Sequence, residues 1–579
     1  MIKPTHVIEL ESLQKHFPAR DTPAIADLTT VLRSGVVTGL IGPDGAGKTT
    51  LIRILAGLMT PTSGKVQVAG LDPITQDRRL HTILGYMPQK FGLYEDLTVI
   101  ENLTLYAELR GVRGERRKQA FDRLLTFTDL TRFTHRMAGK LSGGMKQKLG
   151  LACTLLGQPQ VLLLDEPSVG VDPISRTELW RMVHELADSG MLILWSTSYL
   201  DEAERCSDIL LLNEGKLLFN GVPQTLTQGM AGRTVLIETQ EISHRALLQQ
   251  AICLPDVGDG VIQGKYLRLS LKKGADRHRL LRDLNLFAAK IIDTPPRFED
   301  AFIDLLGGSM DSKSVLTEVL SAIDAPPDET VIEARELTKK YGSFTANDRV
   351  NFRVRRGEIF GLLGPNGAGK STTFKMMCGL QVPSAGQALV LGTDLKTGSG
   401  NVRQRLGYMA QKFALYGNLT VAQNLKFFSG IYGLRGQKQR DKMAEMTGAF
   451  NLHPLLNQKT DSLSLGYKQR LALACALMHE PDILFLDEPT SGVDPITRRE
   501  FWLHINGMVD KGVTVMVTTH FMEEAEYCDR IGLVYRGKII AIGTPDALKH
   551  QVTSEQTPDP TMEQTFIALI KNYDAKEAQ

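Results

Sequence analysis

The chain contains two copies of one long pattern. GLIGPDGAGKTT at Gly39–Thr50 recurs as GLLGPNGAGKST at Gly361–Thr372, an offset of 361 − 39 = 322 residues. The same offset relates VLLLDEPSVGVDPISR, which starts at Val161, to ILFLDEPTSGVDPITR, which starts at Ile483 (483 − 161 = 322). A constant offset over such a distance predicts two copies of one domain, with no insertion in one copy relative to the other. The 579 residues of the chain also exceed what a single hydrophobic core can organise.

A segment of different character lies between the copies. Three leucines in it, Leu267, Leu269 and Leu271, alternate with other residues, as in a half-buried strand. The pattern as a whole predicts strand, helix, two strands, helix and strand, at Thr234–Glu238, Ser243–Leu254, Gly258–Gln263, Tyr266–Leu271, Asp276–Ala288 and Lys290–Asp293. This order predicts a small α+β unit with a ferredoxin-like fold.

The end of this segment resembles the end of the chain. PPRFEDAFIDLL at Pro295 matches DPTMEQTFIALI at Asp559, with an offset of 559 − 295 = 264, so the second copy lacks 322 − 264 = 58 residues. It keeps the closing helix and has lost most of the accessory unit. We expect a first α/β domain over residues 1–226, the accessory α+β unit over 227–306, a linker over 307–330, a second α/β domain over 331–550 and a tail over 551–579.

Composition excludes several classes of protein. The 67 basic and 65 acidic residues nearly cancel, so the chain as a whole is not attracted to nucleic acid or anionic lipid. The six cysteines have neither zinc-site spacing nor the density of a disulfide framework. Cys153 and Cys206 recur as Cys475 and Cys528, which indicates a role in packing for these four thiols. No signal peptide and no apolar run of about 18 residues occurs, so we expect a cytosolic chain without a membrane span.

Both copies contain a phosphate-binding loop of the form GxxxxGK[ST], placed between an apolar strand and a helix. Backbone N–H groups of such a loop surround the phosphates of a nucleotide, the lysine neutralises them and the following hydroxyl binds Mg²⁺. The predicted ATP-binding residues are Gly42, Pro43, Asp44, Gly45, Ala46, Gly47, Lys48, Thr49 and Thr50, and Gly364, Pro365, Asn366, Gly367, Ala368, Gly369, Lys370, Ser371 and Thr372. The two copies together predict an α/β fold with two P-loop NTPase domains.

An acidic pair follows an apolar run in each copy, in VLLLDEP and ILFLDEP. Such runs are typical of strands buried in a parallel sheet, where ligands bind at the carboxyl ends. We expect Asp165 and Asp487 to hold Mg²⁺ through water, and Glu166 and Glu488 to orient or deprotonate the attacking water. The alternative is a surface acidic pair that caps the next helix.

A Ser-Gly turn opens an apolar helix upstream of each acidic pair. LSGGMKQ contains Ser142, Gly143 and Gly144, and LSLGYKQ contains Ser464 and Gly466. Each serine stands 23 residues before the aspartate (165 − 142, 487 − 464). The turn is either a plain helix cap or a second site for phosphate at a helix N-terminus.

In this order and spacing, the motifs resemble the ATP-binding cassettes of the ABC transporter family over both copies. The resemblance implies a helical subdomain in each cassette and head-to-tail closure on two ATP molecules, each held by one cassette's phosphate loop and the other's Ser-Gly turn. It assigns Gln89 and Gln411 to catalysis and Mg²⁺ binding, beside Thr49, Asp165, Ser371 and Asp487 as Mg²⁺ residues. It also implies that Phe17 and Tyr341 stack on adenine. Either aromatic could instead be a core residue at a strand end.

The two copies differ from the family pattern at two positions. The switch position is His520 in VTTHFMEEAE and Ser198 in WSTSYLDEAE, and Leu465 stands where the first copy has Gly143. Under head-to-tail pairing both differences fall in the site of Lys48 and Glu166. We therefore expect one hydrolytic site, at Lys370, and one site that mainly holds ATP.

Three functions fit such a chain. The EDAF and EQTF endings resemble those of ATPase subunits of bacterial type-2 exporters. This resemblance implies two ABC-2-type membrane permease subunits as partners, no nucleic acid, a peripheral location at the cytoplasmic face of the inner membrane, and drugs as the exported class. The alternatives are a soluble ABC-F-type ribosome-associated ATPase, whose long charged linker is missing here, and a tandem sugar-importer ATPase, whose second site is usually the degraded one.

Overall fold

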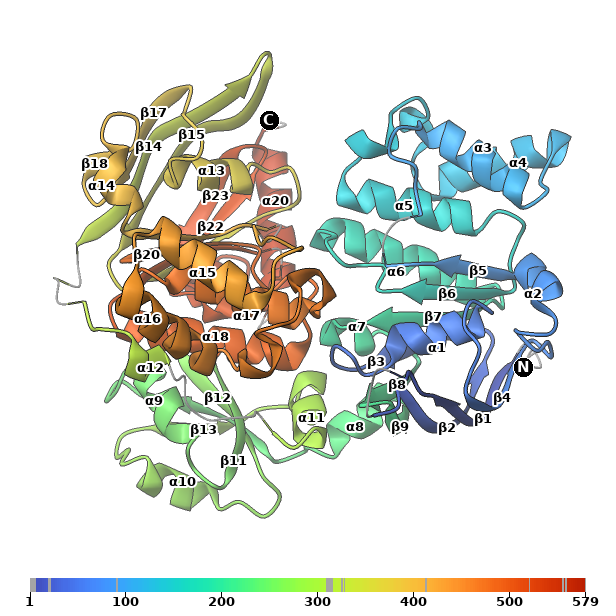
Figure 1. Ribbon diagram of the computed structural model, residues 1–579, viewed down its shortest axis with the longest axis horizontal. Coiled ribbons are helices and arrows are strands. Elements are labelled where there is room, and N and C mark those ends of the chain that lie inside the picture. Colours follow the sequence, from blue (N-terminus) through green and yellow to red (C-terminus); the bar gives the residue numbers. More distant parts are fainter. Residues whose placement is uncertain are drawn as a thin grey trace. The chain divides into compact units, whose positions relative to one another are not determined.

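The computed structural model describes residues 7–18, 22–89, 92–308, 316–323, 326, 329–411, 414–519, 521–554, 557 and 560–577. The chain divides into two compact units (Figure 1). The first contains Met1–Ala231 and Pro296–Leu306, and the second contains Gly232–Pro295 and Gly307–Gln579. Each unit therefore holds one of the predicted α/β domains.

The first unit is built on a six-stranded sheet of order β5-β6-β7-β3-β8-β9, parallel except for β9. Every residue of β3 and β6 is buried, as their apolar runs predict. A second, antiparallel sheet has the order β2-β1-β4. The strands are β1 Val7–Lys15, β2 Ile25–Arg33, β3 Val37–Ile41, β4 Ser63–Val68, β5 Leu84–Met87, β6 Val161–Asp165, β7 Leu192–Thr197, β8 Asp208–Asn213 and β9 Lys216–Gly221.

Helices of the first unit include a separate helical group, α3 to α5 (blue to cyan in Figure 1). Thr98 starts α3 with a capping box, in which its side chain accepts from the Glu101 N–H and Glu101 accepts from the Thr98 N–H. The helices are α1 Lys48–Leu55, α2 Asp77–Ile83, α3 Val99–Leu109, α4 Gly114–Phe127, η1 Thr131–Phe133, η2 Ala138–Lys140, α5 Gly143–Thr154, α6 Pro173–Asp188, α7 Leu200–Ala203, α8 Pro223–Gln228 and α11 Phe298–Leu305. Helix α11 packs on α7 and α8 and closes this cassette.

The second unit repeats this architecture. Its six-stranded sheet, β19-β20-β21-β16-β22-β23, has the same order of equivalent strands, and its antiparallel sheet is β15-β14-β17-β18. The strands are β14 Thr330–Tyr341, β15 Phe344–Arg355, β16 Ile359–Leu363, β17 Ala385–Val390, β18 Thr393–Asp394, β19 Leu406–Met409, β20 Ile483–Asp487, β21 Thr514–Thr519, β22 Arg530–Tyr535 and β23 Lys538–Gly543.

The helices of the second unit cover this sheet and form the equivalent helical group. They are α12 Leu316–Val319, α13 Lys370–Met377, α14 Ser399–Arg403, α15 Val421–Ile431, α16 Gly436–Ala449, η3 His453–Leu455, η4 Thr460–Ser462, α17 Leu465–Leu477, α18 Pro495–Asp510, η5 Glu524–Tyr527, α19 Pro545–His550 and α20 Met562–Glu577. Helix α20 packs on α19 and β23, and α12, from the predicted linker, packs on α16 and α18. The linker therefore contributes Leu316 and Leu320 to the core of the second cassette.

The accessory segment folds as β10 Thr234–Glu238, α9 His244–Ala251, β11 Val257–Gln263, β12 Tyr266–Leu271, α10 Arg277–Asp283 and β13 Lys290–Asp293. Its sheet, β11-β12-β10-β13, is antiparallel throughout, which is the strand order of the ferredoxin-like fold. We call it the ferredoxin-like unit.

Two details of this segment differ from the expectation. The helix predicted to reach Ala288 ends at Asp283. Asn285 adopts a left-handed conformation, and the N–H groups of Phe287 and Ala288 donate to the Glu241 carboxylate instead of continuing the helix. Strand β12 is buried on both faces rather than one, because the Arg268 side chain is also buried and donates to the Pro295 carbonyl at 2.7 Å.

Candidate ATP sites

In each cassette the phosphate loop connects a central strand of the six-stranded sheet, β3 or β16, to the helix that follows it, α1 or α13. Lys48 begins α1 and Lys370 begins α13, so each loop lies at a helix N-terminus. Gly47 has φ 106°, and a Cβ there would lie 2.3 Å from the Ala24 carbonyl oxygen. Only glycine fits such a position. The tight loop therefore exposes its N–H groups toward the space where phosphates bind.

In each copy the loop lysine is buried and bound to its own loop. The Lys48 ammonium donates to the Gly42 and Pro43 carbonyls at 2.6 and 3.2 Å, and Lys370 donates to Gly364 and Pro365 at 2.7 and 3.1 Å. Each Lys48 distance differs from the equivalent Lys370 distance by 0.1 Å (2.7 − 2.6 and 3.2 − 3.1). Both copies thus hold a lysine in the place where it can neutralise a nucleotide phosphate.

The acidic pair lies at the carboxyl end of the neighbouring strand. Asp165 ends β6 and Asp487 ends β20, and the glutamates follow in a left-handed conformation, with φ 50° at Glu166 and 48° at Glu488. Gln89 Nε2 donates to Glu166 Oε2 at 2.9 Å, and Gln411 Nε2 donates to Glu488 Oε2 at 2.8 Å. Backbone strain of this kind is typical of functional sites and costs about 1–3 kcal/mol.

Burial controls the protonation of these carboxyls. It raises the pKa of Glu166 to about 7, although the Lys48 ammonium, 3.8 Å away, opposes the shift. Burial also raises the pKa of Asp165 and of Asp487. Burial therefore favours the neutral form of these three carboxyls over the ionised form.

The hydroxyls after the loop lysines fit a Mg²⁺ site. Thr49 Oγ1 donates to Asp165 Oδ1 at 3.3 Å, and Ser371 Oγ donates to Asp487 Oδ1 at 3.3 Å. Mg²⁺ prefers such hard oxygen ligands, completed by water and phosphate. Within the described residues no group of three or more His, Cys, Asp or Glu side chains could hold a metal ion by itself.

The predicted adenine-stacking residues lie outside the cores. Tyr341 ends β14 and is 49% exposed, and Phe17, just after β1, is half-buried. Lys15 Nζ lies 5.2 Å from the Phe17 ring and Lys339 Nζ 5.4 Å from the Tyr341 ring. These positions are available to a planar base, whereas a core residue would be covered.

The Ser-Gly turns each begin a helix. Ser142 is the N-cap of α5 and accepts from the Met145 N–H at 3.3 Å, whereas Ser464, the N-cap of α17, makes no such bond through its side chain. Both serines are exposed, so both turns are available to an external anion. Gly144 has no room for a side chain, since a Cβ would lie 2.4 Å from Ser175.

The switch positions differ between the copies as the sequence indicates. Ser198 is 1% exposed, and its Oγ has no hydrogen-bond partner among the described residues. His520, the predicted switch histidine, lies outside the described residues. Thr519, directly before it, ends β21 and is buried.

Each copy contains one buried carboxylate that was not predicted from the sequence. Glu524 is fully buried and accepts from the hydroxyls of Thr490 and Thr519, the latter at 2.7 Å. Glu202 is its equivalent (524 − 202 = 322) and accepts from Thr197 at 2.6 Å and Ser168 at 2.9 Å. The carboxylate joins the loop after Glu166 or Glu488 to the end of β7 or β21. Its presence in both copies, in DEAE and EEAE, was the available signal.

The fold and these sites define a class: a tandem P-loop ATPase with two complete cassettes. The sequence matches the ABC transporter family over residues 25–169 and 347–491. The chain belongs to the ABC transporter family of ATP-binding proteins and hydrolyses ATP in connection with transport.

Two individual relatives show which members of the ABC transporter family the chain resembles. The chain is 68% identical over 572 residues to a probable multidrug ABC transporter ATP-binding protein, YbhF, of Escherichia coli (strain K12), with 99% of each chain covered. It is 39% identical over 215 residues to the linearmycin resistance ATP-binding protein LnrL of Bacillus subtilis (strain 168), covering 37% of this chain and 69% of the relative.

Solved structures show the same tandem fold. A structure of a complex containing an archaeal ribosome recycling factor aligns over 95% of both chains with a TM-score of 0.57. At 18% identity this likeness concerns the fold alone. The chain is thus similar over its whole length to a probable multidrug ABC transporter ATP-binding protein, and its tandem fold also occurs in a protein with another function.

Proposed function

We propose that this chain is the ATP-hydrolysing subunit of an exporter whose membrane-spanning part consists of two ABC-2-type permease subunits. The observation that carries the proposal is the full-length identity of 68% to a probable multidrug ABC transporter ATP-binding protein. In the described part of the chain, no helix combines the length and the apolar character needed to cross a bilayer. The chain then acts at the cytoplasmic face of the inner membrane, and drugs are the exported class.

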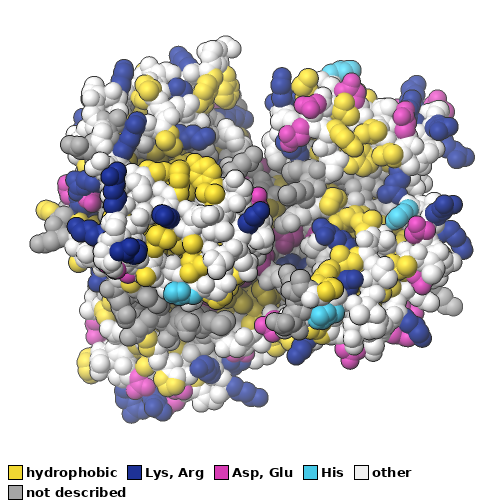
Figure 2. Space-filling model, viewed as in Figure 1, with side chains coloured by type: hydrophobic (Ala, Val, Ile, Leu, Met, Phe, Trp, Pro, Cys, Tyr) yellow, Lys and Arg dark blue, Asp and Glu magenta, His cyan; other side chains and the backbone are white. Residues whose placement is uncertain are grey.

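An exposed aromatic cluster beside Gln411 supports a docking site for a permease helix in the second cassette. Tyr416 and Phe427 are 46% and 40% exposed, and their rings meet edge to face at 4.7 Å. Phe428 packs against Phe427 at 5.4 Å. Figure 2 shows apolar side chains on the surface where α15 faces the viewer. Exposed apolar patches of this kind are typical of interaction sites.

The first cassette has an equivalent surface with fewer aromatics. Tyr94, the counterpart of Tyr416 (416 − 94 = 322), is 57% exposed, and Leu109 at the end of α3 is 72% exposed. Two related but unequal surfaces suit two permease subunits. Because each surface lies a few residues after Gln89 or Gln411, movement of a permease helix would reach the catalytic glutamates through the glutamine–glutamate hydrogen bonds.

The two cassettes close head to tail in this proposal, so each ATP contacts both. One site joins Lys370, Glu488 and His520 to the turn at Ser142. The other joins Lys48, Glu166 and Ser198 to the turn at Ser464. In each site Thr49 or Ser371 and the neighbouring aspartate would hold Mg²⁺, which would neutralise charge on the phosphates.

The sites divide the labour. In the Lys370 site the Glu488 carboxylate takes the proton from water, and His520 holds the γ-phosphate end. The buried serine at position 198 has a side chain too short for that contact, and the loss of one such donor costs about 10²–10³ in rate. The Lys48 site therefore retains ATP and keeps the cassettes closed.

Steady-state ATPase rates of Glu488→Gln and Glu166→Gln test this division. We expect Glu488→Gln to lower the rate by about 10²–10⁴, the usual contribution of a general base, and Glu166→Gln to leave most of it. Equal losses would contradict the division of labour.

Efflux measurements test the transport role. Cells carrying the chain with its genetically neighbouring membrane proteins should extrude a fluorescent drug analogue, and cells carrying Glu488→Gln should retain it. Sedimentation of the chain with ribosomes, or equal efflux by both forms, would contradict the exporter.

A further inference from the structure

The ferredoxin-like unit docks on the second cassette through a buried ion pair. Arg499 Nη2 on α18 lies 3.2 Å from Asp259 Oδ2 on β11, and both side chains are only 5% exposed. Strand β11 also packs against η5, and α9 packs against α18 (Figure 1). Such a pair is costly to break, because removal of one charge leaves the other buried without compensation.

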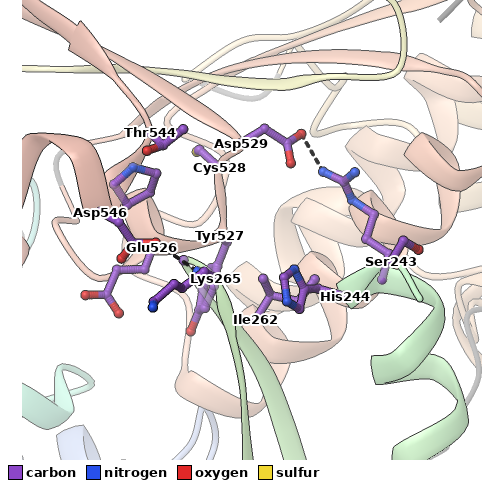
Figure 3. Close-up of a pocket in the computed structure, with 13 residues that line it drawn as sticks. Ser243, His244, Ile262, Lys265, Glu526, Tyr527, Cys528, Asp529, Thr544 and Asp546 are labelled. Atoms are coloured by element: carbon purple, nitrogen blue, oxygen red, sulfur yellow. Dashed lines mark hydrogen bonds and ion pairs between the residues drawn. The ribbon is translucent and has the colours of Figure 1, made fainter. Parts of the chain in front are cut away.

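Further contacts surround the pair. Arg245 donates to Asn506 Oδ1 at 3.2 Å and forms an ion pair with Asp529, and Lys265 N–H donates to Asp546 Oδ2 at 2.9 Å. Figure 3 shows side chains of the ferredoxin-like unit and of the second cassette facing each other across a cavity of about 440 Å³. These polar contacts at the edge of the interface therefore fix the orientation of the ferredoxin-like unit on the second cassette.

The docking surface is specific to the second cassette. At the 322-residue offset, the first cassette has different residues at the positions of Arg499, Leu503, Asn506, Asp529 and Asp546, namely Thr177, Arg181, His184, Ser207 and Gln224. Leu503 packs against the core of the ferredoxin-like unit, where an arginine would be unfavourable. Thr177 is exposed. The same unit could not form these contacts with the equivalent face of the first cassette.

Helix α18 and η5, on which the ferredoxin-like unit packs, also contact residues beside Glu488. Arg498, next to Arg499 on α18, lies 3.9 Å from the buried Glu524 of η5. Glu524 in turn binds the Thr490 and Thr519 hydroxyls. Thr490 follows Glu488 by two residues, and Thr519 precedes the switch position. A shift of α18 or η5 therefore displaces both sides of the site.

We propose that the ferredoxin-like unit is a positioning element for the second ATP site: through its contacts with α18 and η5, it holds Glu488 and Thr519 in the geometry for hydrolysis. Its two ends, Gly232 and Pro295, continue in the sequence into Ala231 and Pro296 of the first unit. Asp259, Arg499 and Arg245 are positioning residues, because the contacts described for them join the ferredoxin-like unit to the second cassette.

Charge reversal tests the proposal on the full chain. In a Glu166→Gln background, which confines turnover to the second cassette, we expect Asp259→Arg and Arg499→Asp each to lower kcat about tenfold, because small displacements of catalytic groups are costly. The KM for ATP should change less than about twofold, since ATP binding in that cassette depends on a separate loop. The double reversal should recover kcat to within about threefold of the background protein, because it re-forms the pair.

Thr177→Asp is the matched control at the equivalent exposed position of the first cassette, and it should leave kcat unchanged. Arg245→Ala removes only the contacts of Arg245 with Asn506 and Asp529. It therefore tests the positioning role if a charge-reversal variant does not fold, and we expect a kcat loss of about threefold. Unchanged kcat in the folded variants, a loss confined to KM, an equal loss in Thr177→Asp, or no recovery in the folded double variant would each overturn the proposal.

Discussion

The buried Glu166 carboxyl makes the stability of the first cassette depend on pH. Burial raises its pKa from the ordinary 4.5 to about 7 in the folded chain. The folded chain therefore binds more protons than the unfolded chain between these values, and the free energy of unfolding falls as pH rises from 4.5 toward 7. Glu166→Gln, which keeps the shape and removes the titration, should abolish that fall.

The size of the effect follows from the shift. One pKa unit corresponds to about 1.4 kcal/mol, so the difference in unfolding free energy between Glu166→Gln and the unmodified chain should grow by about 2–3 kcal/mol from pH 5 to pH 8. The variant is favoured at the higher pH. Urea unfolding of the nucleotide-free proteins, followed for the first cassette at both pH values, measures this difference.

Glu115→Gln, at an exposed position of α4, is the control for the removal of one carboxyl. Parallel stability curves for Glu166→Gln and the unmodified chain would refute the reasoning. Such parallel curves would mean that the folded site stabilises the ionised Glu166 carboxylate as well as water does in the unfolded chain.

Three further predictions concern the second cassette. Gly369→Ala should weaken ATP binding and destabilise the fold by about 1–3 kcal/mol, because the position has φ 104° and a Cβ would lie 2.6 Å from a carbonyl oxygen. Thermal unfolding should show a larger loss than for Gly433→Ala, which shares a positive φ of 82° but has open space around it. Tyr341→Ala should weaken binding of an ATP analogue by about 1–3 kcal/mol in titration calorimetry, and Tyr341→Trp should retain it. Leu465→Gly, which restores the pattern of the first copy, should raise turnover in a Glu488→Gln background, and an unchanged rate there would show that this leucine is benign.

The sequence predicted the paired cassettes because their elements have local signatures. The apolar runs before Lys48 and Asp165 are buried strands, and the glycine-rich loops lie at helix N-termini, as expected. The order of strands in the ferredoxin-like unit was also readable, since each strand and helix in it has its own period.

Long-range contacts were not readable in the same way. Nothing local to Asp259 or Arg499 indicates that they pair, because they are 240 residues apart (499 − 259) and lie on a strand and a helix of different modules. Glu524 stands beside other acidic residues in EEAE, and nothing in that local sequence indicates that it is buried and accepts from two threonine hydroxyls. The helix end near Asp283 depended on a single residue, Asn285, adopting a left-handed turn.

The pairing of each phosphate loop with the other cassette's Ser-Gly turn is tested most directly by the steady-state ATPase rates of Ser142→Arg and Ser464→Arg. A bulky cation at either turn blocks the phosphate contact that the turn makes. Head-to-tail pairing assigns Ser142 to the hydrolytic Glu488 site, so Ser142→Arg should lower turnover by about 10²–10³ and Ser464→Arg should leave most of it. The reverse result, with activity lost in Ser464→Arg and kept in Ser142→Arg, would contradict the composite sites.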